Sequence, residues 1–254
     1  MTTKQKRPGP TRREVLKYGS ATAVVLVVGC GSSDDPEPGG SPDAGPVGDG
    51  GSTVDCTVTP EYTEGPLYVN TGDVRRDITE GLPGAAMMVR LILVDAVTCQ
   101  PLSGLAVDLW HASPEGLYSG VDNGILVPGA PDTAGETYMR GRQITDDAGQ
   151  LSFETVYPGW YPIVPPHLHF TAPFGDGTAF TWQFFLDDAF SDQVYTTVAP
   201  YDTRGTHPVR TEGSPPDLIL RPDGSPNAPI IDRVVGIDLS ALGPVACEYD
   251  RPCP

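Results

Sequence analysis

The chain has 254 residues, a formal net charge of −17, 30 Gly and 28 Pro. Its length is enough for one large domain, and the abundant Gly and Pro favour short strands joined by turns over long helices. A surface this acidic repels phosphate backbones, which disfavours nucleic acid as a partner.

Residues 1–29 have the features of an export signal. The pair Arg12-Arg13 precedes an apolar stretch, residues 21–28, that is too short to cross a bilayer as a stable helix. The arginine pair resembles a twin-arginine signal, and the four residues that end at Cys30 resemble a lipobox, in which that cysteine is lipidated. The alternatives are a chance arginine pair in an ordinary signal and a free Cys30. We expect twin-arginine export and a lipid anchor in the bacterial cell envelope, at the outer membrane or the periplasmic face.

Residues 30–54 are predicted to be a flexible linker. They consist almost entirely of Gly, Pro, Ser and Asp, which cannot bury enough apolar area to order themselves. A tether of this kind is useful if Cys30 is anchored, and the lipid would then be the only contact with the membrane. One domain, residues 55–254, follows the linker.

The cysteines of the mature chain indicate disulfides. An even number outside the cytoplasm predicts two bridges, and the sequence leaves all three pairings open. Metal ligation is the lesser alternative, because the four are far apart and no Cys-x-x-Cys pair is present. These cysteines are Cys56, Cys99, Cys247 and Cys253.

The domain reads as a series of short strands. Apolar runs or alternating patterns of strand length recur along it, separated by Gly/Pro-rich turns, whereas helical periodicity is weak everywhere after residue 30. This pattern predicts an all-β fold, an antiparallel or mixed β-sandwich with long loops. The expected strands are residues 86–95, 105–110, 151–156, 168–172, 180–186 and 230–239.

Two histidines on one expected strand form a candidate metal site. His167 and His169 are two residues apart, so both side chains point to the same face of a strand and can reach one ion. The alternative is a pair of surface histidines, or one that is hydrogen-bonded in the core. His111 is interpreted as structural or as a neighbour of the ligands, and His207 as a solvated loop residue.

Two tyrosines in loops extend this candidate site. Tyr161 lies between Pro158-Gly159 and Pro162, which restrict its backbone and can fix the direction of its ring. Tyr118 lies in a loop that follows the expected strand ending at Trp110. The alternative for both is simple packing.

Together these motifs resemble the intradiol dioxygenases, the family of catechol and protocatechuate dioxygenases, from about Thr57 to about Leu239. The resemblance assigns residues of this chain to the family's metal ligands, its active-site glutamine and the segment that walls its substrate pocket. The assigned metal ligands are Tyr118, Tyr161, His167 and His169, and the assigned glutamine is Gln183. The assigned pocket residues are Gly65, Pro66 and Tyr68, in a segment, Thr63–Tyr68, that precedes Arg76-Asp77-Ile78.

The resemblance implies one Fe(III) per chain, which a set of phenolates and imidazoles favours over Fe(II) or zinc. It further implies that a catechol binds as a dianion and displaces hydroxide and Tyr161, and that these released groups take up the substrate's two protons as bases. O₂ then attacks the ring, and the bond between the two hydroxylated carbons breaks to give a muconate-type diacid.

One position departs from the family pattern. The family usually has an arginine three residues before the first ligand histidine, where this chain has Val164. Loss of one such preorganised group lowers a rate by about 10²–10³-fold. Four arginines are candidate substitutes: Arg140, Arg142, Arg204 and Arg210.

Three functions therefore compete. The first is an intradiol dioxygenase acting on small catechols with O₂, and the acidic surface favours plain or alkylated catechols over anionic ones. The second is an iron-containing, catechol-binding lipoprotein with little or no turnover, which Val164 favours. The third is a metal-free β-sandwich surface module. The sequence predicts no particular oligomeric state.

Overall fold

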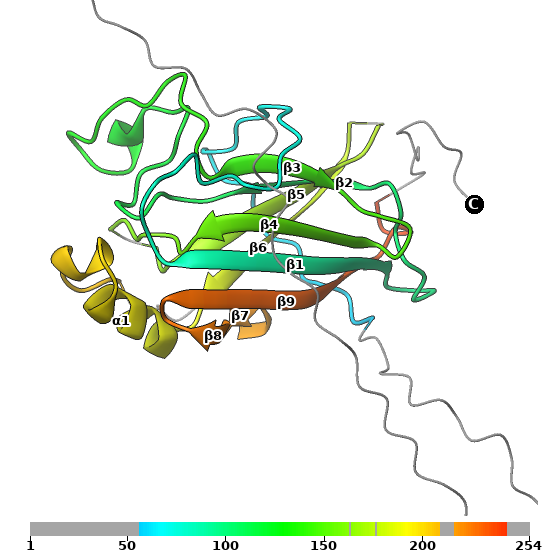
Figure 1. Ribbon diagram of the computed structural model, residues 1–254. Coiled ribbons are helices and arrows are strands. Elements are labelled where there is room, and N and C mark those ends of the chain that lie inside the picture. Colours follow the sequence, from blue (N-terminus) through cyan, green and yellow to red (C-terminus); the bar gives the residue numbers. More distant parts are fainter. Residues whose placement is uncertain (1–55, 163, 176, 209–215, 243–254) are drawn as a thin grey trace, which may run out of the picture. The chain divides into compact units, whose positions relative to one another are not determined.

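The computed structural model describes residues 56–162, 164–175, 177–208 and 216–242, all within the second of two compact units, residues 52–254 (Figure 1). The predicted export signal, Cys30 and the linker lie outside the described residues. So do Arg210, Cys247 and Cys253.

Two mixed β-sheets pack face to face in this domain. Sheet A has the strand order β4-β1-β9-β8, and sheet B has the order β3-β2-β5-β6-β7. Each sheet contains one parallel pair, β1 with β9 and β6 with β7, among antiparallel neighbours. The predicted all-β mixed sandwich is therefore confirmed. The strands are β1 (Ala86–Asp95), β2 (Ala106–Trp110), β3 (Arg140–Ile144), β4 (Gln150–Val156), β5 (His167–Pro173), β6 (Ala179–Leu186), β7 (Ile219–Leu220), β8 (Asp223–Ser225) and β9 (Ala228–Ile237).

The core lies between the two sheets and follows the two-residue period of the strands. From β1, Met87, Val89, Leu91 and Leu93 are buried in turn, and they pack with Phe170 of β5 and other apolar residues of sheet B in one cluster. Each large side chain removed from water in this way contributes about 1.5–3 kcal/mol of transfer free energy. Packing of the inner faces thus fixes the register of the strands, and this register determines where the residues of the outer faces lie.

The structure adds elements that the sequence pattern did not predict. Strand β3, with the sequence Arg-Gly-Arg-Gln-Ile, lacks the apolar alternation of a strand and pairs with β2 along its whole length. Helix α1 (Asp188–Thr197) begins after Asp187, whose side chain accepts a hydrogen bond from the Phe190 amide. Short 3₁₀ helices occur at η1 (Asn123–Ile125), η2 (Tyr201–Thr203) and η3 (Pro216–Leu218).

One disulfide is present among the described residues. Cys56, ahead of the first strand, is bonded to Cys99 in the turn after β1. The bond ties the start of the domain to the sandwich. No helix among the described residues is long and apolar enough to cross a membrane.

Removal of this bridge should destabilise the domain measurably. It closes a loop with a sequence separation of 43, so the double change Cys56→Ala/Cys99→Ala should lower the free energy of unfolding by about 2–4 kcal/mol. Urea denaturation of the purified domain measures this. Reductant should lower the wild-type value toward that of the variant and leave the variant unchanged, and equal stability of the two proteins without reductant would contradict the assignment.

Candidate metal centre

The candidate site lies on the outer face of sheet B. Leu168, Phe170 and Ala172 of β5 point into the core, so the alternate residues His167 and His169 point outward. Every residue from His167 to Ala172 is nevertheless buried, because loops cover this outer face. The site is therefore built from a rigid strand below and from loops above.

The two histidines meet at one point, as the two-residue spacing predicted. Their Nε2 atoms are 2.8 Å apart. The Nδ1 atom of His167 donates to the Pro165 carbonyl at 2.6 Å, which leaves a lone pair on its Nε2. Trp110 stacks on the ring of His169 with 4.8 Å between centroids. A hydrogen bond thus orients His167, as is typical of ligand histidines, whereas His169 is oriented by stacking and its buried Nδ1 has no hydrogen-bond partner.

Tyr118 reaches the same point from the loop between β2 and β3. Its Oη lies 3.3 Å from His167 Nε2 and 3.2 Å from His169 Nε2. The Asn123 side chain accepts from the Tyr118 amide and donates to the Tyr118 carbonyl, each at 2.8 Å. The Thr133 hydroxyl donates to the same carbonyl at 2.6 Å. This backbone is consequently held on both sides.

Tyr161 completes the group from the loop between β4 and β5. Its Oη lies 3.5 Å from His167 Nε2, and its ring stands edge-on to that of Tyr118 with 5.7 Å between centroids. The structure therefore brings together all four residues that the sequence placed in the ligand set.

The spacing of these atoms fits one ion. Metal–nitrogen bonds are about 2.0–2.1 Å long, so two donors on one ion lie about 2.9 Å apart at a right angle and about 3.6 Å apart at 120°. The four measured separations run from 2.8 to 3.5 Å. In the described part of the chain, no cluster of three or more His, Cys, Asp or Glu could hold a metal. An ion here would need the tyrosines.

Burial sets the charge of these groups in the metal-free protein. It lowers the pKa of His167 to about 4, and burial together with the neighbouring His167 lowers the pKa of His169 well below its ordinary value. Burial also raises the pKa of Tyr161, and, with Tyr161 nearby, that of Tyr118 well above its ordinary value. Both imidazoles are therefore neutral near pH 7, as ligands must be. Both phenols stay protonated until a cation binds.

Residues 62–68 run across the outer face of sheet B, from β6 toward β3. Gln183, directly opposite His169 in the β5–β6 pair, donates from its side-chain amide to the Thr63 carbonyl at 2.7 Å. Gly65 follows beside His169, since a Cβ at this glycine would lie 4.0 Å from His169 Cε1. Gln183 and Gly65 thus lie at the site, where the sequence placed them.

The other two residues predicted to line a substrate pocket differ in placement. Tyr68 packs its ring against Trp110 and donates from its hydroxyl to Asp108 at 2.6 Å. Pro66 is exposed, one residue after Gly65. Tyr68 therefore contacts the ring that supports His169, and Pro66 lies on the outer surface of this crossing segment.

Val164, at the position where the family pattern has an arginine, is apolar and has apolar surroundings. Val164 is partly buried and packs against the cluster that contains Tyr118 and Tyr161. Val121, Leu126 and Val127, from the loop that carries Tyr118, pack against the same cluster. The wall beside the two tyrosines is thus aliphatic.

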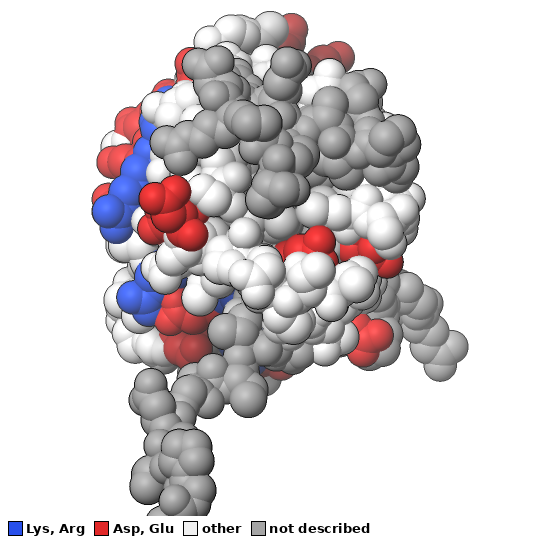
Figure 2. Space-filling view, turned by 90° about the vertical axis from the view of Figure 1, so that its right-hand side faces the viewer, with Lys and Arg blue, Asp and Glu red and all other residues white. Residues whose placement is uncertain are grey.

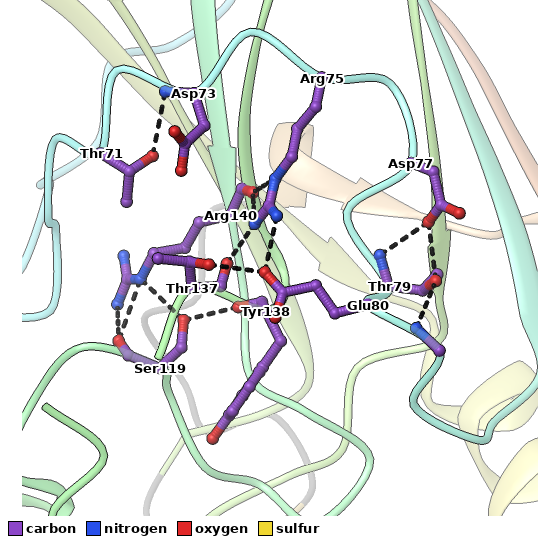
Figure 3. A network of polar contacts seen from close by, with 11 residues as sticks. Thr71, Asp73, Arg75, Asp77, Thr79, Glu80, Ser119, Thr137, Tyr138 and Arg140 are labelled. Atoms are coloured by element: carbon purple, nitrogen blue, oxygen red, sulfur yellow. Dashed lines mark hydrogen bonds and ion pairs between the residues drawn. The ribbon is translucent and has the colours of Figure 1, made fainter. Parts of the chain in front are cut away.

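Of the three candidate arginines among the described residues, Arg140 is the one in the cross-strand row of His169. Its guanidinium donates to the Ser119 carbonyl at 2.7 Å and to the Leu67 carbonyl at 2.8 Å, while its buried Nη1 has no hydrogen-bond partner. Figure 3 shows this side chain turned toward Ser119, within a network that also ties Arg75 to Glu80. Burial lowers the pKa of Arg140 to about 10, so it stays charged near neutral pH.

The register of sheet B explains why Arg140 is close. Arg140, Trp110, His169 and Gln183 occupy one row across β3, β2, β5 and β6, so their side chains share the outer face. Arg142 is paired instead with Asp108 at 2.6 Å. Arg204 donates to two loop carbonyls.

The remaining histidines do not join the ligand set. His111 is buried; its Nδ1 donates to the Ala112 carbonyl and its Nε2 bonds the Thr155 hydroxyl, each at 2.8 Å. This supports its interpretation as structural. His207 was interpreted as solvated, and this is wrong: it is buried, stacks edge-on against Tyr195 and lies 3.0 Å from Asp192. The aromatic surface of Tyr195 removes the ring from water.

A hollow of about 700 Å³ lies elsewhere, on the outer face of sheet A. Arg76, Arg90 and Arg233 line it together with acidic residues, and Arg90 is paired with Asp232. In Figure 2 the basic side chains lie along the left edge, with acidic ones beside them. None of the four residues of the candidate metal centre lines this hollow.

Comparisons with known proteins find relatives by sequence and by structure. A sequence model of the family described as "Dioxygenase" matches residues 59–187. A catechol 1,2-dioxygenase of Acinetobacter baylyi is 33% identical over 113 residues, which cover 42% of this chain and 33% of that protein. A chlorocatechol 1,2-dioxygenase of Pseudomonas putida is 36% identical over 66 residues, covering 26% and 22%. The match thus spans a third or less of these curated relatives.

Solved structures resemble a larger part of the chain. An intradiol ring-cleavage dioxygenase of Tetranychus urticae is 29% identical with a TM-score of 0.59, covering 72% of this chain and 96% of that one. A second dioxygenase structure is 28% identical with a TM-score of 0.61 and the same coverage.

The side chain of Asn123 was not singled out in the sequence, and its loss should loosen the Tyr118 loop. Asn123→Ala removes both partners of the Tyr118 backbone that this side chain supplies, and leaves a buried N–H unpaired. We expect a loss of about 1–3 kcal/mol in the free energy of unfolding. Urea denaturation measures it, with Asn70→Ala as the control because Asn70 is exposed. Equal losses in the two variants would contradict this role.

Proposed function

This chain belongs to the family of intradiol ring-cleavage dioxygenases, and from this premise we propose that it binds one Fe(III) and cleaves a catechol-type ring with O₂. The observation that carries the proposal is that the two imidazole Nε2 atoms lie 2.8 Å apart, with the Tyr118 oxygen 3.2–3.3 Å from both of them and the Tyr161 oxygen 3.5 Å from that of His167. Fold likeness alone would not carry it, because a sandwich hosts many functions.

In this proposal Tyr118, Tyr161, His167 and His169 hold the ion. The two phenolates supply two negative charges, a hard donor set that suits a trivalent cation. Bound there, Fe(III) would supply an electron-accepting Lewis acid that makes the ring of a catechol reactive toward O₂.

The chain's own residues divide the remaining work. Tyr161 takes a proton from a substrate hydroxyl at its Oη, while Tyr118, tied through its backbone to Asn123 and Thr133, stays in place. Gln183 anchors the crossing segment over the site through Thr63. Both atoms of O₂ enter the product, the bond between the two hydroxylated carbons breaks, and a muconate-type diacid forms without an external reductant.

The aliphatic wall narrows the proposed substrate. Four aliphatic residues pack against the cluster that contains both tyrosines, and they offer no charge to a ring carboxylate: Val121, Leu126, Val127 and Val164. The net charge of −17 repels anions at long range. A plain or alkylated catechol therefore fits this wall better than a carboxylated one.

A second function deserves comparison, because Val164 replaces a charge that would assist attack on the ring. It is an iron-containing, catechol-binding protein with little or no turnover. Arg140 bears on the choice: it is a buried cation in the same cross-strand row as His169, and one of its N–H groups has no partner. We favour the dioxygenase because that charge is already close to the ligand residues.

We also propose that the protein is exported and anchored through a lipid on Cys30. The sequence pattern of residues 1–30 supports this. The bond between Cys56 and Cys99 adds support, because such bonds persist outside the cytoplasm.

The first test is a visible spectrum of the purified domain after ferric loading, recorded as catechol is added in air. We expect a broad tyrosinate-to-iron band that shifts with catechol and recovers as a ring-opened diacid accumulates. Tyr118→Phe and Tyr161→Phe should each weaken and move the band, because each removes a phenolate donor. Tyr138→Phe is the control, since its half-buried ring lies outside the ligand set.

The outcomes separate the functions. A band that shifts with catechol and stays shifted would favour the binding protein. A protein that remains colourless after ferric loading would overturn both iron-based functions and leave the metal-free module.

The anchor has its own test. In a host that processes bacterial lipoproteins, the full-length chain should fractionate with membranes. Cys30→Ala should shift the protein to the soluble fraction or leave it as a precursor whose signal is uncleaved. Cys99→Ala serves as a cysteine control. Equal fractionation of wild type and Cys30→Ala would rule out a lipid at this residue.

A further inference from the structure

The two loops that carry the site tyrosines touch each other away from the ligand atoms. We name residues 113–118 the first tyrosine loop and residues 157–161 the second. The Gly159 amide donates to the Ser113 carbonyl at 3.0 Å. A Cβ added at Gly116 would collide with the Trp160 carbonyl, so the backbones approach as closely as glycine permits.

One side chain joins these loops directly. Arg204, just after η2, donates from Nη1 to the Pro114 carbonyl at 3.0 Å and from Nη2 to the Trp160 carbonyl at 2.6 Å. Its guanidinium carbon also lies 4.5 Å above the centre of the Trp160 ring. A planar guanidinium can make both bonds at once with fixed geometry. Arg204 thus bridges the first loop and the residue immediately before Tyr161.

Two tyrosines of the same region reinforce the second loop. Tyr195, on α1, donates to the Pro158 carbonyl at 2.7 Å, and Tyr201, on η2, donates to the Tyr157 carbonyl at 2.5 Å. Three of the four carbonyls before Tyr161 are therefore held by the stretch from α1 to Arg204. Only Arg204 among these donors also reaches the first loop.

From this geometry we propose that Arg204 is a positioning residue that fixes the separation of Tyr118 and Tyr161, and thereby the affinity and the electronic character of the metal centre. The proposal rests on the function proposed above in one respect, that these tyrosines are ligands. Arg204 is half-buried among carbonyl oxygens and the face of an indole ring. These contacts offset the free-energy cost of its partial loss of hydration.

The physical consequence of losing Arg204 is specific. Without it the Trp160 and Pro114 carbonyls lose a common partner. The second loop keeps its backbone bonds from Gly159 to Ser113 and from Tyr157 to Ala85, and its bonds to Tyr195 and Tyr201, but the Trp160 carbonyl next to Tyr161 loses the donor that joins it to the first loop. The two phenol oxygens should then vary in distance from the histidines, although both tyrosines are still present. A metal centre is sensitive to such errors, because it needs its donors within about 0.5 Å of their places.

The experiment compares Arg204→Ala and Arg204→Lys with Arg221→Ala. Arg221 is a matched control: it also lies over an aromatic ring, that of Phe190, and contacts Asp187 rather than the tyrosine loops. The first readout needs no metal. Hydrogen exchange of the metal-free domain should show about ten-fold or greater loss of protection in residues 113–118 and 157–161 of Arg204→Ala, with strand β1 unchanged.

The second readout uses ferric loading. Arg204→Ala should bind Fe(III) about ten-fold or more weakly and shift the tyrosinate-to-iron band, an effect that a general loss of stability would not produce. Arg204→Lys should recover part of the protection, because an ammonium can reach one carbonyl without matching the planar fork. Arg221→Ala should keep the wild-type band and affinity.

The outcomes are separable. Wild-type exchange in Arg204→Ala would overturn the bridge itself. Altered exchange with unchanged iron affinity and band would overturn its effect on the centre. If the wild type binds no iron, the proposed function fails, and the exchange data still decide whether Arg204 joins the loops. If Arg204→Ala does not fold, Arg204→Lys decides by the same measurements.

Discussion

The alternation of side chains along β5 is the constraint on which the rest of the site depends. Leu168 and Phe170 must face the core, which forces His167 and His169 onto the opposite face. A slip of one residue would bury the imidazoles in the sandwich and expose the aromatic core. The packing that stabilises the fold therefore also determines where the two nitrogens lie, and no separate device is needed to aim them.

Everything above the two histidines is supplied by loops, and each loop is secured by polar side chains. Asn123 and Thr133 hold the backbone of Tyr118, whereas Arg204 and the phenols of Tyr195 and Tyr201 hold the segment before Tyr161. These partners come from distant parts of the chain. A site that combines a strand with loops thus gains its rigidity from hydrogen bonds to backbone carbonyls and amides, rather than from regular secondary structure.

The sequence predicts the fold and the candidate ligands well where the signal is local. The near-continuous apolar run of residues 86–95 predicts β1, and the spacing of His167 and His169 predicts their common face. The sequence fails where the cause is tertiary. Strand β3 begins Arg-Gly-Arg because its outer face is covered by loops, and α1 presents too few apolar residues for its period to stand out. The burial of His207 depends on Tyr195 of that same helix, and the Cys56–Cys99 pairing depends on distance in space.

The disulfide at the start of the domain has a mechanical consequence. A force applied ahead of residue 56 would meet a covalent link to the turn after β1 before it reached residues 62–68 over the candidate metal centre. The Thr59 amide also donates to the Gly236 carbonyl of β9 at 2.8 Å, which attaches the start of the domain to the sandwich at a second point. Tension along an anchored N-terminal segment would therefore be borne by the sandwich. Residues 62–68, which cover the site, would then carry little of this tension.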